Sequence, residues 1–431
     1  MPANQQTIYT NRKKCTHANI TLASLNVKGR ASPTLGTNMT SKWPIINKTV
    51  RDNKIGILCI QETHLSDEHE KQIESLFSRR LLVLNSREPN HPGSSAGIAF
   101  IINKEKVNIN NAKMTVIIPG RAIALTINWH NEKTIRILNI YAPNNHSEHP
   151  NFWNTIKTLW PSHGLGLIDF MMGDFNVTED PLDRAPARFD TEYAIEALRE
   201  FRTSMNIQDT WRHTHLTTRL FTFTSNTNSM SHLDRIYTSP AHSDSVSDWK
   251  TYLCPIPTDH NITLVRFAPP GLPHIGRGRW TWPLSILSDK PLIEKIEKIG
   301  IKLQNDIEKM NIPGNRTETE NPLYLWEEFK INMNNLVKQT TKSHLAKINN
   351  KIKQLQKDIH KTSNAPNIDS SVNRRQNKTI LEKEIEHLER KRQKSAHLKA
   401  QAQWSLQGET ISKYWTKVNN PKKPRDIIHR L

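Results

Sequence analysis

The chain has 431 residues, which is long enough for two or three domains. Hydrophobic residues make up 35% of it, below the usual globular share, so we expect part of the chain to lack a full core. The three cysteines, Cys15, Cys59 and Cys254, are far apart and form no Cys-x-x-Cys pair, which argues against a disulfide framework and a zinc module. No apolar run approaches the ~20 residues that span a bilayer, and Met1–Cys15 lacks the apolar segment of a secretory signal.

The formal net charge of +19 is unevenly distributed along the chain. Residues 271–431 hold 31 Lys and Arg against 17 Asp and Glu, a net of +14, whereas residues 1–270 have a net of +5. A basic excess of this kind favours a polyanionic partner, above all nucleic acid. The alternative is a solvated helical face that has no such partner.

Short β-rich runs alternate with polar turns across residues 19–268. The predicted strands are Ile20–Val27, Ile55–Gln61, Ala96–Asn103, Arg121–Trp129, Thr134–Tyr141, Gly166–Gly173, His232–Thr238 and Asn261–Phe267. Several are apolar throughout, as expected of strands that are covered on both faces. Helices are predicted at Trp43–Asp52, Asp67–Arg79 and Asp190–Met205. Strands interleaved with helices over ~250 residues imply a layered α/β domain.

The composition changes near residue 270, where a Pro- and Gly-rich cluster interrupts the pattern. We predict a polar tail at 1–18, the α/β domain at 19–268, a linker at 269–290 and a basic helical connector at 291–431. Apolar residues recur at spacings of three and four from Leu345 to Ile359 and again from Leu381 to Leu388. This spacing predicts a helical hairpin or coiled coil over 342–400, and it leaves pairing within one chain and self-association of two chains open.

Polar motifs stand at the ends of the apolar runs, which is where α/β proteins form their sites. They read Ser24-Leu25-Asn26-Val27, Gln61-Glu62-Thr63-His64, Ile140-Tyr141-Ala142-Pro143-Asn144, Gly173-Asp174-Phe175-Asn176, Ser231-His232-Leu233-Asp234-Arg235-Ile236 and Thr258-Asp259-His260. Phosphodiester hydrolysis needs carboxylates for a hard divalent cation, a base that activates water, and donors for the phosphate oxygens. The set supplies all three, so it predicts a metal-dependent phosphodiesterase site.

Two of these motifs carry candidate metal and water ligands. Glu62 follows the apolar run Ile57–Ile60, where a carboxylate suits Mg²⁺ bound through one acid and waters; an ordinary solvated strand end is the alternative. Asp174 and Asn176 are two residues apart, and on an extended chain both side chains would share a face. There they would orient a water and bind a phosphate oxygen. The alternative is an Asx turn, since Asp and Asn favour turns.

The pair Asp259 and His260 offers a candidate histidine for catalysis. Because adjacent residues of a strand point in opposite directions, we predict that Asp234, and not Asp259, orients the imidazole of His260. A histidine held by a carboxylate serves as a general base or as a donor to phosphate, and a purely structural pair is the alternative. Tyr141 and Asn144 are predicted to bind phosphate or assist the leaving group, although Tyr141 alone fits a packing aromatic equally well.

Together these residues resemble the exonuclease–endonuclease–phosphatase superfamily. The resemblance rests on Asn26, Glu62, Tyr141, Asp174, Asn176, Asp234, Asp259 and His260. The sequences of five motifs are most similar to the endonuclease domain of non-LTR (LINE-type) retrotransposon polyproteins. These motifs are Ser-Leu-Asn-Val, Gln-Glu-Thr-His, Asn-Ile-Tyr-Ala-Pro-Asn, Gly-Asp-Phe-Asn and Thr-Asp-His-Asn. The resemblance covers residues 19–268. It implies a DNase I-like α/β fold, a four-layer sandwich of two mixed β-sheets flanked by helices.

The resemblance also implies a role for each residue of the site. Glu62 and Asn26 would hold Mg²⁺, for which Mn²⁺ is the expected substitute. Asp174 would activate the water, and Asn176 would hold the phosphate.

On the same basis, His260, buttressed by Asp234, would contact the scissile phosphate. Asp259 would assist at the metal or the phosphate, and Tyr141 would stabilise the phosphate or the leaving group. The expected substrate-binding residues are Asn144, Thr222 and Arg235. The family's Ser-Arg-Ile-Asp is here Ser-His-Leu-Asp, so His232 replaces an arginine that would contact substrate.

The C-terminal part resembles the connector that precedes the reverse transcriptase in such polyproteins, on residues 276–283 and 408–415. No Tyr-x-Asp-Asp polymerase signature is found in the sequence. We therefore predict a Mg²⁺-dependent endonuclease that nicks DNA and leaves a 3′-hydroxyl, as in target-primed retrotransposition, with RNA bound by the basic helices.

Two alternatives stay open. One is a phosphatase or phosphodiesterase of the same fold that acts on a non-DNA phosphoester, and the other is a catalytically dead remnant that binds nucleic acid. The expected location is nuclear, or both cytoplasmic and nuclear, and not secreted. That expectation rests on the DNA substrate and on the basic clusters Arg12-Lys13-Lys14 and Lys422-Lys423-Pro424-Arg425.

Overall fold

The computed structural model describes residues 19–33, 39–91, 93–129, 133–269, 282, 289–312, 317 and 321–407. These fall into two compact units. The first holds the described residues within Met1–Gly278 and Pro366–Arg375, and the second holds those within Arg279–Ala365 and Gln376–Asn420. The predicted tail, both basic clusters, the stretch 408–415 and most of the predicted linker lie outside the described residues.

The first sheet of the first unit has six strands in the order β15-β16-β1-β4-β6-β5. In that order they are Val246–Tyr252, Ile262–Phe267, Ile20–Asn26, Ile55–Gln61, Ile98–Asn103 and Leu81–Ser86. Strands β1 and β4 are parallel, and the other neighbours are antiparallel. Every residue of β4 and β6 is buried, which explains why their sequences are apolar almost without interruption.

The second sheet has five strands in the order β14-β10-β9-β8-β7. In that order they are Asp234–Thr238, Phe170–Asp174, Lys133–Tyr141, Ala122–Trp129 and Lys113–Ile118. Only β9 and β10 are parallel neighbours in this sheet. Two small sheets complete the unit: β11 (Arg184–Ala185), β13 (Met230–Ser231) and β12 (Phe223–Thr224), and β2 (Ala31–Pro33) with β3 (Met39–Ser41).

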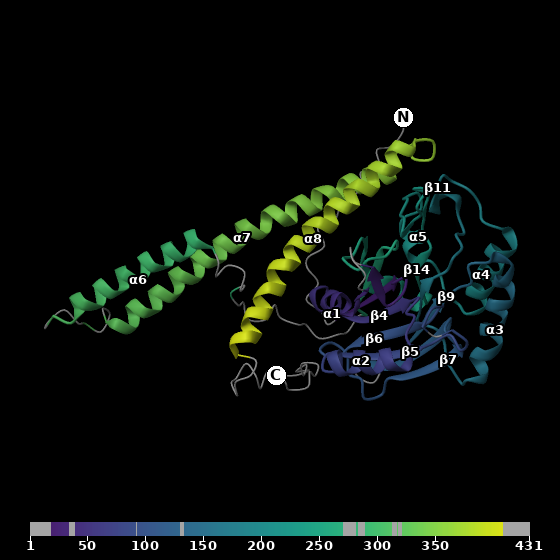
Figure 1. Ribbon diagram of the computed structural model, residues 1–431, viewed down its shortest axis with the longest axis horizontal. Coiled ribbons are helices and arrows are strands. Elements are labelled where there is room, and N and C mark those ends of the chain that lie inside the picture. The colour runs from purple at the N-terminus through teal and green to yellow at the C-terminus, as the bar shows by residue number, and fades with distance from the viewer. Residues whose placement is uncertain are drawn as a thin grey trace. The chain divides into compact units, whose positions relative to one another are not determined.

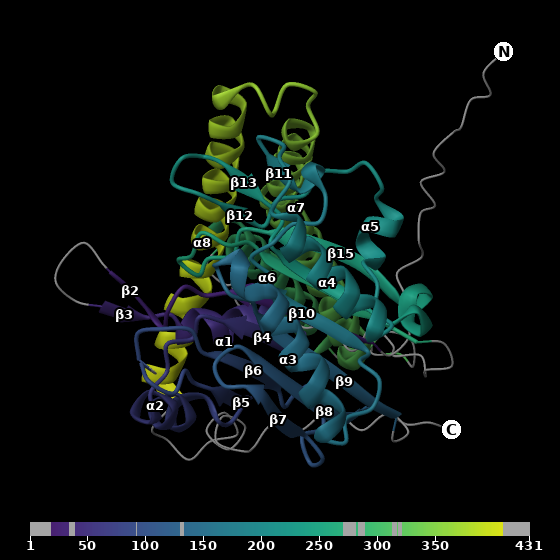
Figure 2. The ribbon, with the colours of Figure 1, turned by 90° about the vertical axis from the view of Figure 1, so that its right-hand side faces the viewer.

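The two large sheets pack face to face on a shared apolar core. Side chains from both contribute to it, among them Leu22, Phe100, Leu125, Ile137 and Met172. Helices cover the outer face of each sheet (Figures 1 and 2). The helices against the first sheet are α1 (Trp43–Asp52) and α2 (Asp67–Phe77). Those against the second are α3 (His149–Ser162) and α4 (Glu192–Ser204).

This order of helix, sheet, sheet and helix is the predicted four-layer α/β sandwich, so the predicted fold class is confirmed. Its shorter helices are η1 (His146–Glu148), η2 (Pro181–Asp183), α5 (Thr210–Thr214) and η3 (Pro240–Ser245). They lie in the connections between strands, and η1 directly follows the end of β9 and its Asn-rich motif.

The described part of the second unit is helical. Its helices are α6 (Lys290–Met310), α7 (Pro322–Ser363) and α8 (Val372–Gln407), the first turn of α8 belonging to the first unit. Ile352, Leu355 and Ile385 are buried in a small cluster, so the predicted apolar stripe does pair two helices. These helices extend beyond the predicted limits of 342–400 at both ends. No helix within the described ranges is long and apolar enough to cross a membrane.

Candidate active site

The strand register brings the predicted motifs to one edge of the two sheets. In the parallel pair β1 and β4, Asn26 is opposite Gln61, so Glu62 follows directly beyond. In the parallel pair β9 and β10, Tyr141 is opposite Asp174. Parallel strands end at the same edge of a sheet, which is why residues far apart in sequence meet here.

The amide of Asn26 joins the two carboxylates that come from different sheets. Its Nδ2 donates to Glu62 Oε1 at 2.8 Å and to Asp174 Oδ2 at 2.9 Å. The Tyr141 hydroxyl donates to the same Glu62 oxygen at 3.0 Å. Burial and the nearby carboxylates of Glu62 and Asp174 raise the pKa of Tyr141 well above its usual range, so this hydroxyl keeps its proton.

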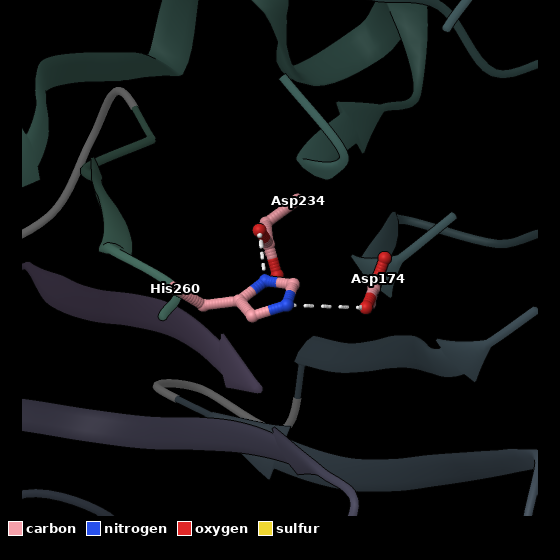
Figure 3. A group of neighbouring side chains, drawn as sticks. All are labelled: Asp174, Asp234 and His260. Atoms are coloured by element: carbon pink, nitrogen blue, oxygen red, sulfur yellow. Dashed lines mark hydrogen bonds and ion pairs between the residues drawn. The ribbon is translucent and has the colours of Figure 1, made fainter. Parts of the chain in front are cut away.

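His260 lies between two aspartates (Figure 3). Its Nδ1 is 2.8 Å from Asp234 Oδ2, and its Nε2 is 3.9 Å from Asp174 Oδ2. All three side chains are buried, Asp234 completely. The register explains the approach of the aspartates, because Asp234 is directly opposite Asp174 across the antiparallel pair β14 and β10. The predicted contact between Asp234 and His260 is therefore present.

The carboxylates of Asp234 and Asp174 change the protonation of His260. Burial opposes the charged imidazolium, but the carboxylates of Asp234 and Asp174 outweigh it and raise the pKa of His260 to about 9. Burial and the charge of Asp234 raise the pKa of the Asp174 carboxyl, against the opposite effect of His260. Asp174 is therefore a stronger base than an ordinary carboxylate, and His260 is a cation at neutral pH.

Asp174 and Asn176 form the Asx turn that was the alternative to an extended chain. The Asn176 N–H donates to Asp174 Oδ1 at 3.1 Å, and the Asn176 φ of +50° lies in the left-handed region. The Asn176 amide donates to Asn144 Oδ1 and to the Ala142 carbonyl, both at 2.9 Å. Asn144 is exposed, so the two amides stand together at the rim of the site.

Asp259 faces away from the imidazole that follows it. Its Oδ2 accepts a hydrogen bond from Lys28 Nζ at 2.6 Å, and its side chain is 25% exposed. The preceding Thr258 hydroxyl donates to the Asn26 carbonyl at 2.9 Å, which ties the two ends of the domain together beside the site. This position places Asp259 on the rim, with a lysine as its partner.

Two residues expected to bind substrate are instead buried. The Thr222 hydroxyl accepts hydrogen bonds from the N–H groups of Leu233 (3.0 Å) and Asp234 (2.9 Å), so it supports the strand that carries Asp234. Arg235 is 3% exposed, and its two terminal nitrogens donate to Asp183 and Asp209. Arg235 belongs to an interior ion-pair network. We revise both predictions because neither side chain is accessible to a substrate.

The donor set fits a hard divalent cation. Oxygens of Glu62 and Asp174 converge on one amide nitrogen, and a carboxylate oxygen of Asp234 lies within 4.8 Å of one from Asp174. Asp234 Oδ1 is buried and has no hydrogen-bond partner among the described residues. The expected pair was Glu62 with Asn26, but the Asn26 oxygen accepts the Lys28 N–H at 2.9 Å. Asn26 therefore holds the carboxylates and does not present an oxygen ligand.

Sequence reasoning missed two residues that touch the site. The Phe223 ring lies 5.0 Å from the His260 ring, centre to centre, and Lys28 holds Asp259. Phe223 is next to Thr222, but nothing in the sequence indicates that its ring packs on a histidine. Lys28 is separated from its partner by 231 positions, and one exposed lysine carries no pattern that would single it out.

Residues 23–260 match the Endonuclease/Exonuclease/phosphatase family. No curated protein sequence matches the chain. Among solved structures, the AP endonuclease LMAP from Leishmania major is 15% identical, with a TM-score of 0.49, and the match covers 59% of this chain and 89% of that one.

Two further structures have a similar match. An AP endonuclease from Archaeoglobus fulgidus is 19% identical (TM-score 0.45), with 57% of this chain and 99% of that one covered. The endonuclease domain of TRAS1, a telomere-specific non-LTR retrotransposon, is 12% identical (TM-score 0.41), with 58% and 99% covered.

Proposed function

Because the chain belongs to the endonuclease/exonuclease/phosphatase family, we propose that it is a Mg²⁺-dependent endonuclease that nicks DNA and leaves a 3′-hydroxyl. The observation that carries this proposal is the convergence of Glu62, Asp174 and the buried Asp234–His260 pair at one edge of the two sheets. This set provides cation ligands, a strong base and a cationic donor within one site.

Asp174 is the proposed general base. Its Oδ1 and Oδ2 are fixed by the Asn176 N–H and by the Asn26 amide, and its raised pKa suits it to take a proton from the attacking water. The water oxygen bonds to phosphorus as the bond to the 3′-oxygen breaks. The products are a 3′-hydroxyl, which takes up a proton, and a 5′-phosphate.

His260 is the proposed donor to the phosphate. Asp234 holds its Nδ1 proton, and at 3.9 Å from Asp174 the Nε2–H has room for a phosphate oxygen as acceptor. Mg²⁺, when bound, neutralises charge on the phosphate and on the leaving oxygen. The Tyr141 hydroxyl holds Glu62 in place, and as a protonated group beside the site it is the proposed stabiliser of the phosphate or the leaving group. Asn144, whose oxygen accepts from the Asn176 amide, supplies a further amide donor at the rim.

We further propose that the substrate is DNA and that the biological role is target-primed retrotransposition. This rests on the sequences of the motifs, which resemble those of LINE-type endonuclease domains, and on the net charge of +14 in residues 271–431. Binding of RNA by the basic helices, self-association through them and a nuclear location are parts of the same proposal. Hydrolysis of a different phosphoester is the competing outcome.

The test is conversion of supercoiled plasmid to open circle by the full chain, with Mg²⁺, with Mn²⁺ and with EDTA. His260→Ala is compared with His163→Ala, an exposed histidine outside the site. We expect nicking to stop with EDTA and to fall about 10²–10⁴-fold in His260→Ala, with His163→Ala unchanged. Extension of the nick by a polymerase checks for the 3′-hydroxyl. A folded wild-type chain that leaves plasmid intact and cleaves only small phosphomonoesters would overturn the endonuclease assignment.

A further inference from the structure

The segment Pro366–Arg375, which follows α7, is part of the first unit. Ile368 is 1% exposed and completes an apolar cluster with Ala185, Phe221 and Met230, residues of the α/β domain. A fully buried isoleucine in a short polar segment requires a formed apolar surface to receive it. The segment is therefore seated on the α/β domain at this cluster.

A bidentate ion pair fixes the next residue. Arg219 Nη1 and Nη2 donate to Asp369 Oδ1 and Oδ2 at 2.8 and 2.7 Å, and the Ala187 N–H also donates to Oδ1 at 2.8 Å. Arg375 donates to the carbonyls of Ile368 and Asp369 at 2.9 and 2.8 Å, which fixes the backbone of the segment. Paired guanidinium–carboxylate bonds of this kind are strong and restrict orientation.

Desolvation opposes ionisation of the Asp369 carboxyl, but the bonds from Arg219 and from the Ala187 N–H outweigh it and lower its pKa. The carboxylate is thus charged at neutral pH. The Arg219 side chain is only 11% exposed, so solvent screens this pair less than it screens an ion pair on an open surface.

The segment 219–224, which bears Arg219 and Phe221 and ends in β12, also supports the catalytic pair. Thr222 Oγ1 accepts from the Asp234 N–H, and the Thr222 carbonyl accepts from the Asn261 N–H at 2.6 Å. Phe223 forms a backbone bridge with His260 and packs on its ring. The continuous segment 219–224 therefore connects the residues that receive Ile368 and Asp369 to both Asp234 and His260.

We propose that Pro366–Arg375 is a docking segment that positions the catalytic Asp234–His260 pair through the segment 219–224, which ends in β12. Asp369 and Arg219 are positioning residues, since neither touches the reacting groups. This inference rests on the proposed function for its effect on rate, but the geometry that it describes can be tested without activity. It makes the region between the long helices part of the nuclease rather than only a connection to it.

The test uses the full chain with Asp369→Ala, Arg219→Ala and the double substitution. If the two residues act through each other, we expect each single substitution to lower kcat for nicking about tenfold with KM unchanged, and the double to be no worse than either. Independent roles would instead multiply the losses. Lys351→Ala and Glu384→Ala, which remove a 3.2 Å ion pair in the second unit, form the matched control and should leave kcat unchanged.

A second readout needs no catalysis. In protein labelled at the histidine rings, the His260 NMR signal is expected to shift in Asp369→Ala and Arg219→Ala but not in the control variants. Asp369→Asn, which keeps an acceptor for the Ala187 N–H, replaces Asp369→Ala if that chain does not fold. Asp369 variants with an unmoved His260 signal would overturn the proposal. If the His260 signal shifts in these variants but the wild-type protein does not nick DNA, the docking proposal is supported and the nuclease assignment is rejected.

Discussion

The α/β unit and the helical unit differ in what holds their residues in place. In the α/β unit, three apolar clusters fill the space between and outside the two sheets, and hydrogen bonds join residues more than a hundred positions apart, such as Asn26 and Asp174. In the described part of the helical unit, the apolar clusters are small and large side chains such as Leu323 (79% exposed) face solvent.

The α/β unit holds its side chains rigidly, whereas residues 271–431, which include the helical unit, carry most of the excess positive charge. A site that hydrolyses phosphodiesters needs groups fixed to fractions of an ångström, and the edge of the two covered sheets supplies that. The proposed polyanionic partner would need charge spread along a surface, which the basic residues of the long helices would supply. Substitutions in the α/β unit should therefore change the rate of nicking and the stability of the fold, and substitutions in the helical unit should mainly change the binding of nucleic acid.

The largest effect should come from the base at the sheet edge. Asp174→Asn keeps the size of the side chain and one of its two hydrogen-bond acceptors but removes the proton acceptor. We expect nicking to fall about 10²–10⁴-fold, while the unfolding transition stays in place or moves up, because a buried charge is removed. Asp358→Asn, on helix α7, is the matched control and should leave the rate unchanged. Equal losses in both variants would remove the distinction between the units.

Core truncation should separate the two units in stability. Leu125 is fully buried between the two sheets, and Leu355 is buried in the small cluster between helices. Leu125→Ala should cost about 2–5 kcal/mol of unfolding free energy, and Leu355→Ala should fall at or below the low end of that range, since its surroundings can relax. Urea denaturation followed by circular dichroism measures both. A larger loss for Leu355→Ala would reverse the comparison.

The pH dependence of the catalytic pair should be intermediate in size. Because the pKa of His260 is raised to about 9, its contribution to stability is complete below the unfolded value of about 6.5 and is lost as pH rises through about 9. Asp234→Asn should lower the His260 pKa by at least about 1 unit, since it removes the nearest carboxylate. NMR titration of metal-free protein measures this. An unchanged titration midpoint of His260 would mean that Asp234 does not hold the Nδ1 proton of the imidazole.

The smallest effects should come from single charges on the helices. Lys353 and Lys357 are exposed on α7. Replacing both with Gln should weaken nucleic-acid binding severalfold and reduce the slope of log K against log salt by about 1–2, because each phosphate contact releases counterions. Lys71→Gln with Lys157→Gln, on α2 and α3, is the matched pair and should change the slope less. Fluorescence anisotropy at several salt concentrations makes the measurement.

The fully covered strands could be predicted from the sequence, and the half-covered ones could not. β4 and β6 are buried along their whole length, so their apolar runs stand out. β7 and β15 alternate exposed and partly buried residues near the sheet edges, and their mixed composition resembles that of turns. α3 was missed because its first turn contains Pro150 and it contains Pro161 near its end, two residues that normally indicate a turn.

The candidate site shows the same limit at the level of side chains. Asp174, Asp234 and His260 could be grouped because each follows or begins an apolar run, and strand ends are where sites form. The burial of Arg235 could not be foreseen, because it depends on Asp183 and Asp209, two partners distant in sequence. That of Thr222 could not be foreseen either, because its hydroxyl binds the backbone N–H groups of Leu233 and Asp234. The turn at Asn176 could not be predicted either, because the same residue spacing fits both an extended chain and an Asx turn.

The pairing of the first and last strands of the domain has a consequence for how the protein is made. Strand β1 is hydrogen-bonded to β16, with Ile20 opposite Phe267, and the Thr258 hydroxyl binds the Asn26 carbonyl. A ribosome that has delivered β1 must still deliver more than two hundred residues before His260 can reach its place. On the proposed function, the nascent chain would therefore be inactive until the domain is nearly complete, and fragments that end before His260 would carry Glu62 and Asp174 without a complete site.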